Sequence, residues 1–533
     1  MTKILLRDDR IYIATPYNPT LVKAFGQIPG RKWYPDEKEW SFPMCCRVEV
    51  VKALGDLLKP AARDEILKAY FVDMNPQEYT KQKLYPYQEF GVRYLLNNRK
   101  VILADSMGLG KTPQSLIACA YLLEQKKIDA VLIFAPKSLK AQWKAQIFKF
   151  LDTEDVCLVE GNQKKRLDLY TAGHRFYIFN YETIIKDLPW FDLLPSRLCI
   201  ILDEAQRIKN WRSKISQSIK ELDAKYKFVL TGTPLENNLL ELYSINSFID
   251  NGIFGGIGAF NSRFVVRNEW GAVTNYKNLK YLHEILTHVM LRRRKQDVDL
   301  DLPELIVSEY NISLSPDEIS DYNKIASPIY AALKTPGISP NVIFGSLTLL
   351  RCYVGHPDIV RNSKSKLAAG LKLKAKTSSK FIEFQEIIKD LFDSGVQNCV
   401  VYTSFVEMQK ILATWLTGKY PFTILKGGMD AKEIQSAVDE FKTGNTQIFL
   451  STDSGALGLN LENCSTIINY DIPYNPAIIS QRISRLHRIG QKNNVVAINL
   501  HVSELNNIEE HIKKIVGFKT DLFAQIIDGE GGE

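Results

Sequence analysis

Short runs of apolar residues alternate with longer amphipathic stretches in two parts of the chain. In the first part, which begins near Leu84, these runs predict strands at 101–104, 130–135, 176–180, 198–202 and 228–230. In the second part, which begins near Lys380, they predict strands at 399–403, 422–425, 447–451 and 466–470. Strands that alternate with helices are typical of a parallel sheet wrapped by helices. The pattern therefore predicts an α/β fold with two parallel-sheet lobes.

The rest of the chain follows other patterns. From about 235 to 373 the strand rhythm fades, which favours a helical insertion between the lobes. Residues 1–60 predict a small α/β domain whose elements are a strand at 11–14, a helix from Asn18-Pro19, a hairpin at 31–42 and a helix at 48–58. A charged connector is expected from Pro60 to about Lys83. We therefore expect domains at 1–70, 84–245, 246–370 and 371–520, and a tail at 521–533 that is frayed from Asp528 onward.

Composition narrows the class of protein. The chain has 533 residues, 45% of them hydrophobic and 24% charged, which excludes a mainly disordered, collagenous or coiled-coil protein. Its eight cysteines form no C-x-x-C pair, so we expect buried thiols rather than disulfides or a zinc site. The longest uncharged stretch, 335–350, is broken by Pro and Gly, so it is not expected to cross a membrane. The N-terminus is charged and lacks the apolar core of a signal peptide. A soluble protein is expected, and its net charge of +8 permits a polyanionic partner.

The segment 104–112, Ala-Asp-Ser-Met-Gly-Leu-Gly-Lys-Thr, follows a predicted strand and opens a predicted helix. Glycines there let backbone N–H groups turn toward a phosphate, and the helix N-terminus adds a favourable dipole. The lysine is expected to reach the β and γ phosphates, and the threonine hydroxyl suits Mg²⁺. The alternative is a glycine-rich turn with an incidental lysine. The predicted nucleotide-binding residues of this loop are Asp105, Ser106, Met107, Gly108, Leu109, Gly110, Lys111 and Thr112.

Two adjacent acids follow the predicted strand at 198–202. Carboxylates at the carboxyl end of a parallel strand lie where such folds bind ligands. We therefore expect Asp203 to hold Mg²⁺, Glu204 to polarise the attacking water and Gln206 to sense the γ-phosphate. The alternative is that Asp203 only caps the next helix.

A predicted helix from Asn475-Pro476 to about Gly490 carries arginines. Gln481, Arg485 and Arg488 are spaced i, i+4 and i+7, so one helix face would present all three. The guanidinium groups match phosphate geometry and are expected to act as arginine fingers. The alternative is a basic solvated face, and His487 is expected to be structural.

These elements, in this order, resemble the SWI/SNF family of superfamily 2 helicase-like ATPases between about Leu84 and Ile512. The segments that resemble the family's motifs are 84–91, 105–112, 135–143, 180–183, 203–210, 230–238, 401–405, 451–461 and 481–491. Ser106 and Gln206 depart from the usual residues. Segment 291–298 resembles the family's connector between lobes, and its alternative is a solvated basic turn.

The resemblance implies two RecA-like lobes with ATP and Mg²⁺ bound between them, and movement along double-stranded DNA. It implies that Gln88 recognises adenine and that Gly458 and Gln481 also meet the nucleotide. The residues that it implies for contact with DNA are Lys137, Ser138, Asn180, Thr231, Thr403, Ser404, Thr452 and Asn460.

The N-terminal segment 25–43 resembles the HARP module of annealing-helicase-type proteins. Arg31 and Lys32 are expected to meet phosphate, and Trp33 to stack on unpaired bases. The alternative is that the tryptophans form the core of the small domain. The resemblance suggests work on forked or branched DNA.

Two other functions remain open at this stage. One is a strand-separating DNA or RNA helicase of the same superfamily. The other is a protein that bridges nucleic acids and uses ATP only as a switch. We expect a monomer, located in the cytoplasm or at the nucleoid of a bacterial or viral system.

Overall fold

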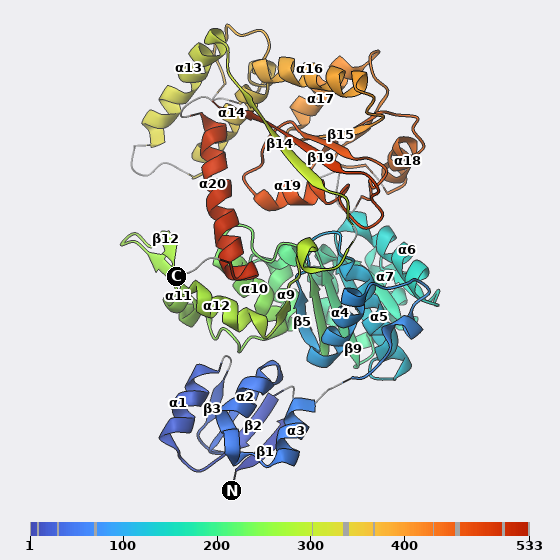
Figure 1. Ribbon diagram of the computed structural model, residues 1–533, viewed down its shortest axis with the longest axis vertical. Coiled ribbons are helices and arrows are strands. Elements are labelled where there is room, and N and C mark those ends of the chain that lie inside the picture. Colours follow the sequence, from blue (N-terminus) through green and yellow to red (C-terminus); the bar gives the residue numbers. More distant parts are fainter. Residues whose placement is uncertain are drawn as a thin grey trace. The chain divides into compact units, whose positions relative to one another are not determined.

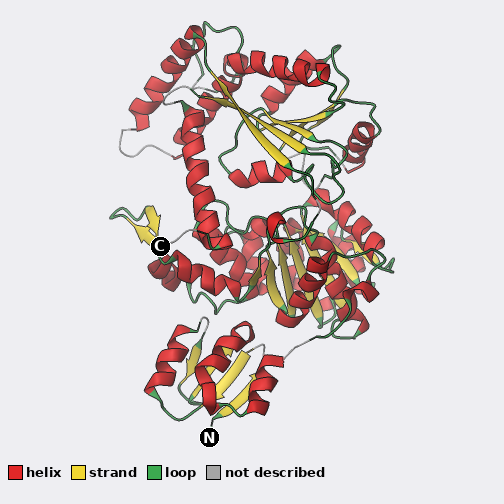
Figure 2. Cartoon of the chain, in the orientation of Figure 1, coloured by secondary structure: helices red, strands yellow, loops and turns green. Residues whose placement is uncertain are grey.

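The computed structural model describes residues 2–7, 10–28, 31–68, 72–300, 302–333, 340–365, 368–429, 431–453, 459–503 and 507–530. The chain divides into two compact units. Unit 1 comprises Met1–Leu300 and Leu522–Glu533, and unit 2 comprises Asp301–Asp521. Figure 1 colours them along the sequence, and Figure 2 colours them by secondary structure.

Unit 1 begins with a small antiparallel sheet of order β1-β2-β4-β3. Its strands are β1 (Lys3–Arg7), β2 (Arg10–Ala14), β3 (Lys32–Tyr34) and β4 (Glu39–Pro43). The helices beside it are α1 (Pro19–Gln27), α2 (Arg47–Leu54) and α3 (Pro60–Lys68). Asn18 caps α1 by accepting from two backbone N–H groups, which confirms the predicted start. The expected connector after Pro60 is wrong at its beginning, because Pro60 opens a helix.

The main sheet of unit 1 has seven parallel strands in the order β13-β5-β10-β9-β6-β8-β7. They are β5 (Lys100–Leu103), β6 (Ala130–Ala135), β7 (Val156–Leu158), β8 (Phe176–Asn180), β9 (Leu198–Asp203), β10 (Tyr226–Leu230) and β13 (Met290–Leu291). The five strands predicted here are confirmed. Strands β7 and β13 were missed because so few residues give no readable period.

Helices cover both faces of this sheet, which is why most residues of its strands are apolar and buried. Alternate residues of β5 enter two separate cores: Val101 and Leu103 pack with one, and Ile102 packs with the other. The helices of this part are α4 (Pro86–Asn98), α5 (Lys111–Glu124), α6 (Lys140–Phe150), α7 (Gln163–Thr171), α8 (Ile184–Asp187), α9 (Lys214–Glu221), α10 (Leu239–Ile249), α11 (Ile257–Phe264) and α12 (Leu279–Thr287).

Unit 2 holds a six-stranded parallel sheet of order β14-β19-β18-β15-β17-β16. Its strands are β14 (Leu305–Ile312), β15 (Cys399–Thr403), β16 (Phe422–Leu425), β17 (Ile448–Thr452), β18 (Thr466–Asn469) and β19 (Val495–Val502). Its helices are α13 (Pro316–Leu333), α14 (Pro340–Gly355), α15 (Pro357–Arg361), α16 (Ser379–Asp393), α17 (Val406–Leu416), α18 (Ala431–Lys442), α19 (Pro476–Ile483) and α20 (Ile508–Phe523). The prediction of two RecA-like parallel-sheet lobes is confirmed.

The stretch from 235 to 373 is less helical than expected. Between α11 and α12 the chain forms an antiparallel hairpin of β11 (Val265–Arg267) and β12 (Val273–Tyr276). Further on, β14 is an edge strand of the second sheet. Most of its side chains are exposed, so its sequence carries no buried apolar signature.

The C-terminal segment returns to unit 1. A π-helical turn, Ala524–Asp528, follows α20, and Ile526 and Ile527 are buried in the core of unit 1. These two side chains anchor the first part of the tail. The fraying expected from Asp528 onward is wrong at Asp528 and Glu530, which pair with Arg292 and Arg294. The seven cysteines other than Cys45 are free thiols, as predicted. Among the described helices, none has the length and hydropathy needed to cross a membrane.

Candidate nucleotide site and nucleic-acid-facing surfaces

The predicted phosphate loop links β5 to α5. Gly108 and Gly110 have φ values of +89° and +74°, which L side chains rarely adopt. These conformations turn the loop around the N-terminus of α5. The Lys111 ammonium folds back over the loop and donates to the carbonyl oxygens of Asp105 at 2.7 Å and Ser106 at 3.4 Å. A bound phosphate would replace these carbonyls as the partner of the ammonium.

Residues at the start of α4 brace this loop. The Tyr87 hydroxyl and the Gln88 side-chain amide both donate to the carbonyl of Leu109, at 2.9 and 3.3 Å. The other end of the Gln88 amide accepts from the Tyr85 N–H. A Cβ at Gly110 would lie 2.5 Å from Gln88 Nε2, so only glycine fits there. Gln88, predicted to recognise adenine, thus also fixes the loop.

Asp105 does not face the nucleotide as the sequence suggested. Its carboxylate is fully buried and accepts from Arg293 Nε at 2.9 Å and Arg293 Nη2 at 2.5 Å. Gln114 donates to the same carboxylate at 3.2 Å. The side chain therefore anchors the loop from behind, and a nucleotide contact of Asp105 remains predicted only for its backbone.

Arg293 is a functional candidate that the sequence reasoning missed. It also donates to the Tyr87 carbonyl, and the Ser106 N–H donates to the Arg293 carbonyl at 2.9 Å. Its neighbour Arg292 donates to the Ala104 carbonyl and pairs with Asp528, both at 2.8 Å. The run of arginines at 292–294 was the sequence feature that could have revealed this role. The alternative that this segment is a solvated basic turn is wrong at Arg292 and Arg293.

The acidic pair lies at the carboxyl end of β9. Asp203 accepts from the Trp143 indole N–H at 2.7 Å and from the Glu204 N–H at 3.0 Å. Loss of hydration, together with the charge of Glu204, raises the pKa of Asp203 to about 7. Glu204 has a left-handed backbone with φ +50°, which marks a constrained position at the end of the strand. Burial lowers the pKa of Lys111, and the charges of Asp105, Glu204 and Asp203 oppose that shift.

A short chain of contacts leads from Glu204 to the segment after β10. Gln206 donates to the Glu204 carboxylate at 2.8 Å and accepts from the Thr231 hydroxyl at 3.5 Å. Met107 of the phosphate loop packs where a Cβ at Gly232 would lie, with Cγ only 2.5 Å from that point. The loop, the acidic pair and the segment at 231–232 are thus brought together, as the predicted motifs require.

The donor set suits Mg²⁺. Asp203 supplies a carboxylate and Thr112 a hydroxyl, and both are hard oxygen ligands. No group of three or more His, Cys, Asp or Glu side chains with metal-site geometry occurs in the described ranges. Mg²⁺ commonly takes one or two protein ligands and completes its shell with water and substrate phosphates, so this sparse set fits.

The arginines of unit 2 do not share one helix face. Helix α19 ends at Ile483, and Arg485 and Arg488 lie in the turns after it. After Ile483 the chain turns more tightly, and the Arg485 N–H donates to the Arg482 carbonyl, three residues back, at 3.2 Å. Arg488 donates to the Asn460 side chain, and burial lowers the pKa of its guanidinium. The buried ring of His487 contacts the Pro303 carbonyl at 2.8 Å, consistent with a structural role.

Arg482 organises this part of unit 2, and the sequence reasoning overlooked it. The guanidinium is 3% exposed and pairs with Asp453 at 2.7 Å. It also donates to Asn469 and to the Asp471 carbonyl, at 3.0 and 3.1 Å. The charges of Arg482 and Arg351 outweigh burial and hold the pKa of Asp471 below its usual value. Asp471 in turn accepts from the Ser404 N–H.

Three residues predicted to contact DNA have buried side chains. Thr231, Thr403 and Thr452 are 1%, 0% and 3% exposed. The Thr403 hydroxyl donates to Asp471 at 2.6 Å. Thr403 and Thr452 are the last residues of β15 and β17, and Thr231 directly follows β10. Their contacts with DNA remain predictions. Asn460 accepts from Arg488, Gln481 is partly buried on α19, and Gly458 lies outside the described residues.

Two other DNA candidates of unit 1 line a hollow of about 510 Å³. Lys137 and Asn180 are among its lining residues, and Ser138 is exposed next to Lys137. Lys140 and Arg166 also line it. They are neutralised by Glu160 at 2.9 Å and Asp187 at 2.7 Å, respectively. The exposed Lys137 and Lys186 therefore supply its accessible positive charge.

The N-terminal candidates divide between core and surface. Trp33 is 45% exposed, and its ring lies tilted against that of Trp40 with the centroids 5.1 Å apart. Trp40 packs against the core of the small sheet. Arg31 and Lys32 are exposed beside Trp33. The alternative that both tryptophans form the core holds for Trp40 and is wrong for Trp33.

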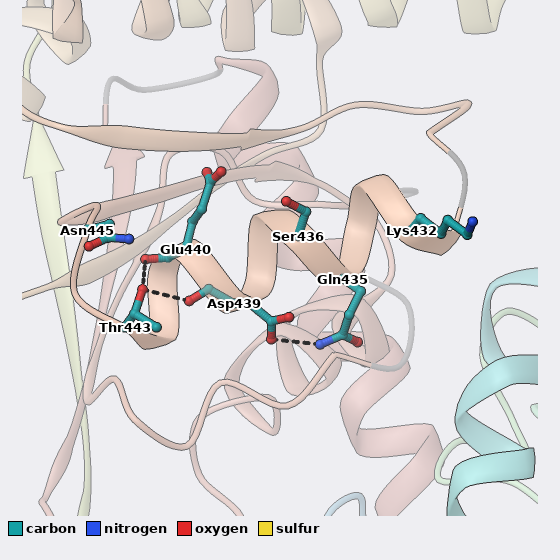
Figure 3. A pocket seen from close by; sticks show the side chains of 7 residues that line it. All are labelled: Lys432, Gln435, Ser436, Asp439, Glu440, Thr443 and Asn445. Carbon is teal, nitrogen blue, oxygen red and sulfur yellow. Dashed lines mark hydrogen bonds between the residues drawn. The ribbon is translucent and has the colours of Figure 1, made fainter.

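A second hollow of about 510 Å³ lies along α18. Figure 3 shows its polar lining, which includes Lys432, Asp439, Glu440 and Asn445. Side chains here bond one another, as between Gln435 and Asp439 at 2.8 Å. None belongs to a predicted motif.

Comparison with known proteins gives two family matches and several relatives. The SNF2-related domain matches residues 87–359, and the helicase conserved C-terminal domain matches 380–490. A Bacillus subtilis protein named as an ATP-dependent helicase/translocase, YwqA, is 30% identical over 84% of this chain and 49% of its own length. Chromodomain-helicase-DNA-binding protein 7 of Gallus gallus is 30% identical over 79% of this chain and 15% of its own.

Among solved structures, the Sulfolobus solfataricus SWI2/SNF2 ATPase core in complex with dsDNA is 27% identical to this chain, with a TM-score of 0.42. The alignment covers 86% of this chain and 96% of the Sulfolobus chain. The chain spans about half the length of YwqA and less of the chromodomain protein. The SNF2-related match covers more than half of the 533 residues, and the second match follows it in the expected order. The chain therefore belongs to the SNF2-related family.

Proposed function

We propose that this protein is a DNA-dependent ATPase that moves along duplex DNA, acting as a monomer. The observation that carries the proposal is the convergence of Lys111, Asp203 and Glu204 at the carboxyl ends of β5 and β9, linked to Thr231 through Gln206. A lysine, a metal-binding carboxylate and a second carboxylate for water are the groups that phosphoryl transfer to water needs. Family membership supports the same chemistry.

In the proposed reaction, the loop N–H groups and Lys111 hold the β and γ phosphates. Mg²⁺ held by Asp203 and Thr112 would neutralise charge on the phosphate oxygens. Glu204 orients and polarises the attacking water, and Gln206 keeps its carboxylate in place. Arg485 and Arg488 remain predicted as the arginines that stabilise the transition state.

Duplex DNA is the proposed track, and the hollow bounded by Lys137 and Lys186 is a proposed contact with its backbone. Exposed lysines there release counterions when they meet phosphates, so affinity for DNA should fall as salt rises. The exposed Arg31, Lys32 and Trp33 support a HARP-like role for the N-terminal domain on forked or branched DNA.

The test is ATP hydrolysis measured with no DNA, single-stranded DNA, duplex and forked DNA. Stimulation by duplex, with a further increase on forks, is expected. Glu204→Gln should bind ATP but not turn it over, whereas Lys111→Ala should lose ATP affinity. Rates of ATP hydrolysis that stay the same whichever DNA is added would contradict the proposal. Function that survives Glu204→Gln but not Lys111→Ala would favour an ATP-bound switch instead.

A further inference from the structure

The hairpin β11–β12 carries the most exposed large hydrophobic side chain among the described residues. Trp270, in the turn between the strands, is 90% exposed. It has no ring or cation partner within the described ranges. Figure 1 shows the hairpin projecting from the α11–α12 region of unit 1. An indole in water keeps its apolar faces available, and burying them against a partner would be stabilising.

The turn that presents Trp270 is well ordered by hydrogen bonds. The Asn268 side chain accepts from the N–H groups of Trp270 at 3.1 Å and Ala272 at 2.9 Å. Asn268 and Ala272 also pair through their backbones at 2.9 Å. Arg267 donates to the Gly271 carbonyl at 2.8 Å, and Gly271 has φ +76°. An aromatic ring on a fixed turn pays little entropy when it stacks.

The base of the hairpin is tied to unit 1. The Asn278 side chain donates to the Arg263 carbonyl at 2.7 Å, and the Lys277 N–H donates to the Phe264 carbonyl at 3.0 Å. Tyr276 packs against the core of unit 1. A two-stranded ribbon is marginal alone, so this anchorage lets the tip keep its conformation.

The charge around the ring indicates the class of partner. Between 263 and 280 there is one acidic residue, Glu269. Four basic residues accompany it: Arg263, Arg267, Lys277 and Lys280. A rigid aromatic ring within a basic segment matches a nucleobase with its neighbouring phosphates. In an intact duplex the faces of the bases are occupied by stacking, so the ring needs an unpaired base.

We propose that Trp270 stacks on an unpaired base of DNA at a junction between single and double strands. The inference rests on the proposed function and adds to it the structure that is recognised. It locates a base contact in unit 1, separate from the phosphate-binding hollow and from the N-terminal domain.

The test compares Trp270→Ala and Trp270→Phe with the wild-type protein by fluorescence anisotropy. The probes are a blunt duplex, a single strand and a duplex with one single-stranded arm, all at one salt concentration. Trp270→Ala should weaken binding to the armed duplex and the single strand by about 5-fold to 100-fold, with little change on the blunt duplex. Trp270→Phe should retain most of the affinity. Phe344→Ala, which removes an aromatic that is 68% exposed on α14, is the matched control and should change neither.

A second readout places the contact. A 2-aminopurine base in the arm next to the junction should be quenched by the wild type and not by Trp270→Ala. Equal binding of wild type and Trp270→Ala to every DNA would overturn the inference and would point to a protein partner for the ring. An equal loss on all three DNAs would overturn base stacking. In either case duplex-stimulated ATP hydrolysis by the wild type would leave the proposed function standing.

Discussion

At the residue scale, the phosphate loop depends on Arg293, which lies far from it in sequence. The Arg293 guanidinium fills the space behind the loop and neutralises the fully buried carboxylate of Asp105. A buried charge that loses its partner costs far more than an exposed one. Arg293 therefore positions the loop without touching the reacting groups.

Replacing Arg293 with Ala should leave Asp105 buried and unpaired. We expect unit 1 to lose about 3–5 kcal/mol, measured as a lower urea midpoint, and ATP-analogue affinity to fall with it. The matched control is Arg294→Ala, because Arg294 pairs with the more exposed Asp297 and Glu530 and should change little. Arg293→Lys should recover part of the loss. Equal effects at 293 and 294 would contradict the account.

The pKa of Asp203 makes a second prediction at this scale. Because it is about 7 in the folded protein and about 4 in an unfolded chain, the folded state binds the extra proton between these values. The contribution of Asp203 to the free energy of unfolding without nucleotide should therefore fall as pH rises from about 4 to 7. Asp203→Asn should remove that part of the pH dependence, as read from urea titrations. An identical pH profile in this variant would show that the carboxyl is not shifted.

Mg²⁺ binds the ionised carboxylate of Asp203. Rising pH should therefore strengthen Mg²⁺ binding while it weakens the contribution of Asp203 to stability. Affinity for Mg²⁺–nucleotide should increase with pH up to about 7 and then level off.

At the element scale, most of the strands that were predicted have side chains buried on both faces of a sheet. β19 is also buried and was not predicted. Strands such as β6 consist only of buried apolar residues, and that run survives in the sequence. β14 failed because it lies at an edge and is mostly exposed. The helix predicted from 475 to about 490 is too long, because after Ile483 the chain turns more tightly and the Arg485 N–H donates to the Arg482 carbonyl.

In the candidate site, too, some residues could be predicted from the sequence and others could not. Lys111, Asp203 and Glu204 were predictable because local motifs specify them. Arg293 and Arg482 were not, since their partners lie far away in the sequence and only the folded chain brings them together. The burial of the Thr231, Thr403 and Thr452 side chains was not predictable either, because sequence does not say which way a residue at the end of a strand points.

The phosphate loop as an element can be tested with two glycines. Gly110→Ala places a Cβ 2.5 Å from Gln88, in addition to the strain of φ +74°. Gly173→Ala has nearly the same φ, +76°, but meets nothing within 4 Å. Both should lose about 1 kcal/mol to backbone strain, and only Gly110→Ala should also lose binding of an ATP analogue. Calorimetric titration of both variants with the ATP analogue measures this difference. If the two variants bound the analogue equally well, Gln88 would not brace the loop.

At the scale of the whole molecule, the two parallel sheets and the N-terminal domain serve separable tasks in this account. The nucleotide groups lie in unit 1, the candidate arginine fingers lie in unit 2, and the N-terminal sheet presents Arg31, Lys32 and Trp33. The small sheet has its own core, so it is expected to be removable.

Deleting residues 1–70 should leave ATP hydrolysis on plain duplex within about twofold of the wild type and reduce the additional stimulation by forked DNA. The physical reason is that the exposed Trp33 and its basic neighbours add contacts only where unpaired bases occur. Hydrolysis rates on both DNAs, at equal salt, provide the measurement. An equal loss on both would argue that the domain supports the ATPase itself.

The most direct test of movement along duplex DNA is whether the protein displaces a third DNA strand that is bound to the duplex ahead of it. Wild-type protein should release the third strand only when ATP is hydrolysed, and Glu204→Gln should bind ATP and DNA but release none. Wild-type protein that hydrolyses ATP on duplex DNA at full rate, yet leaves the third strand in place, would contradict movement along the duplex.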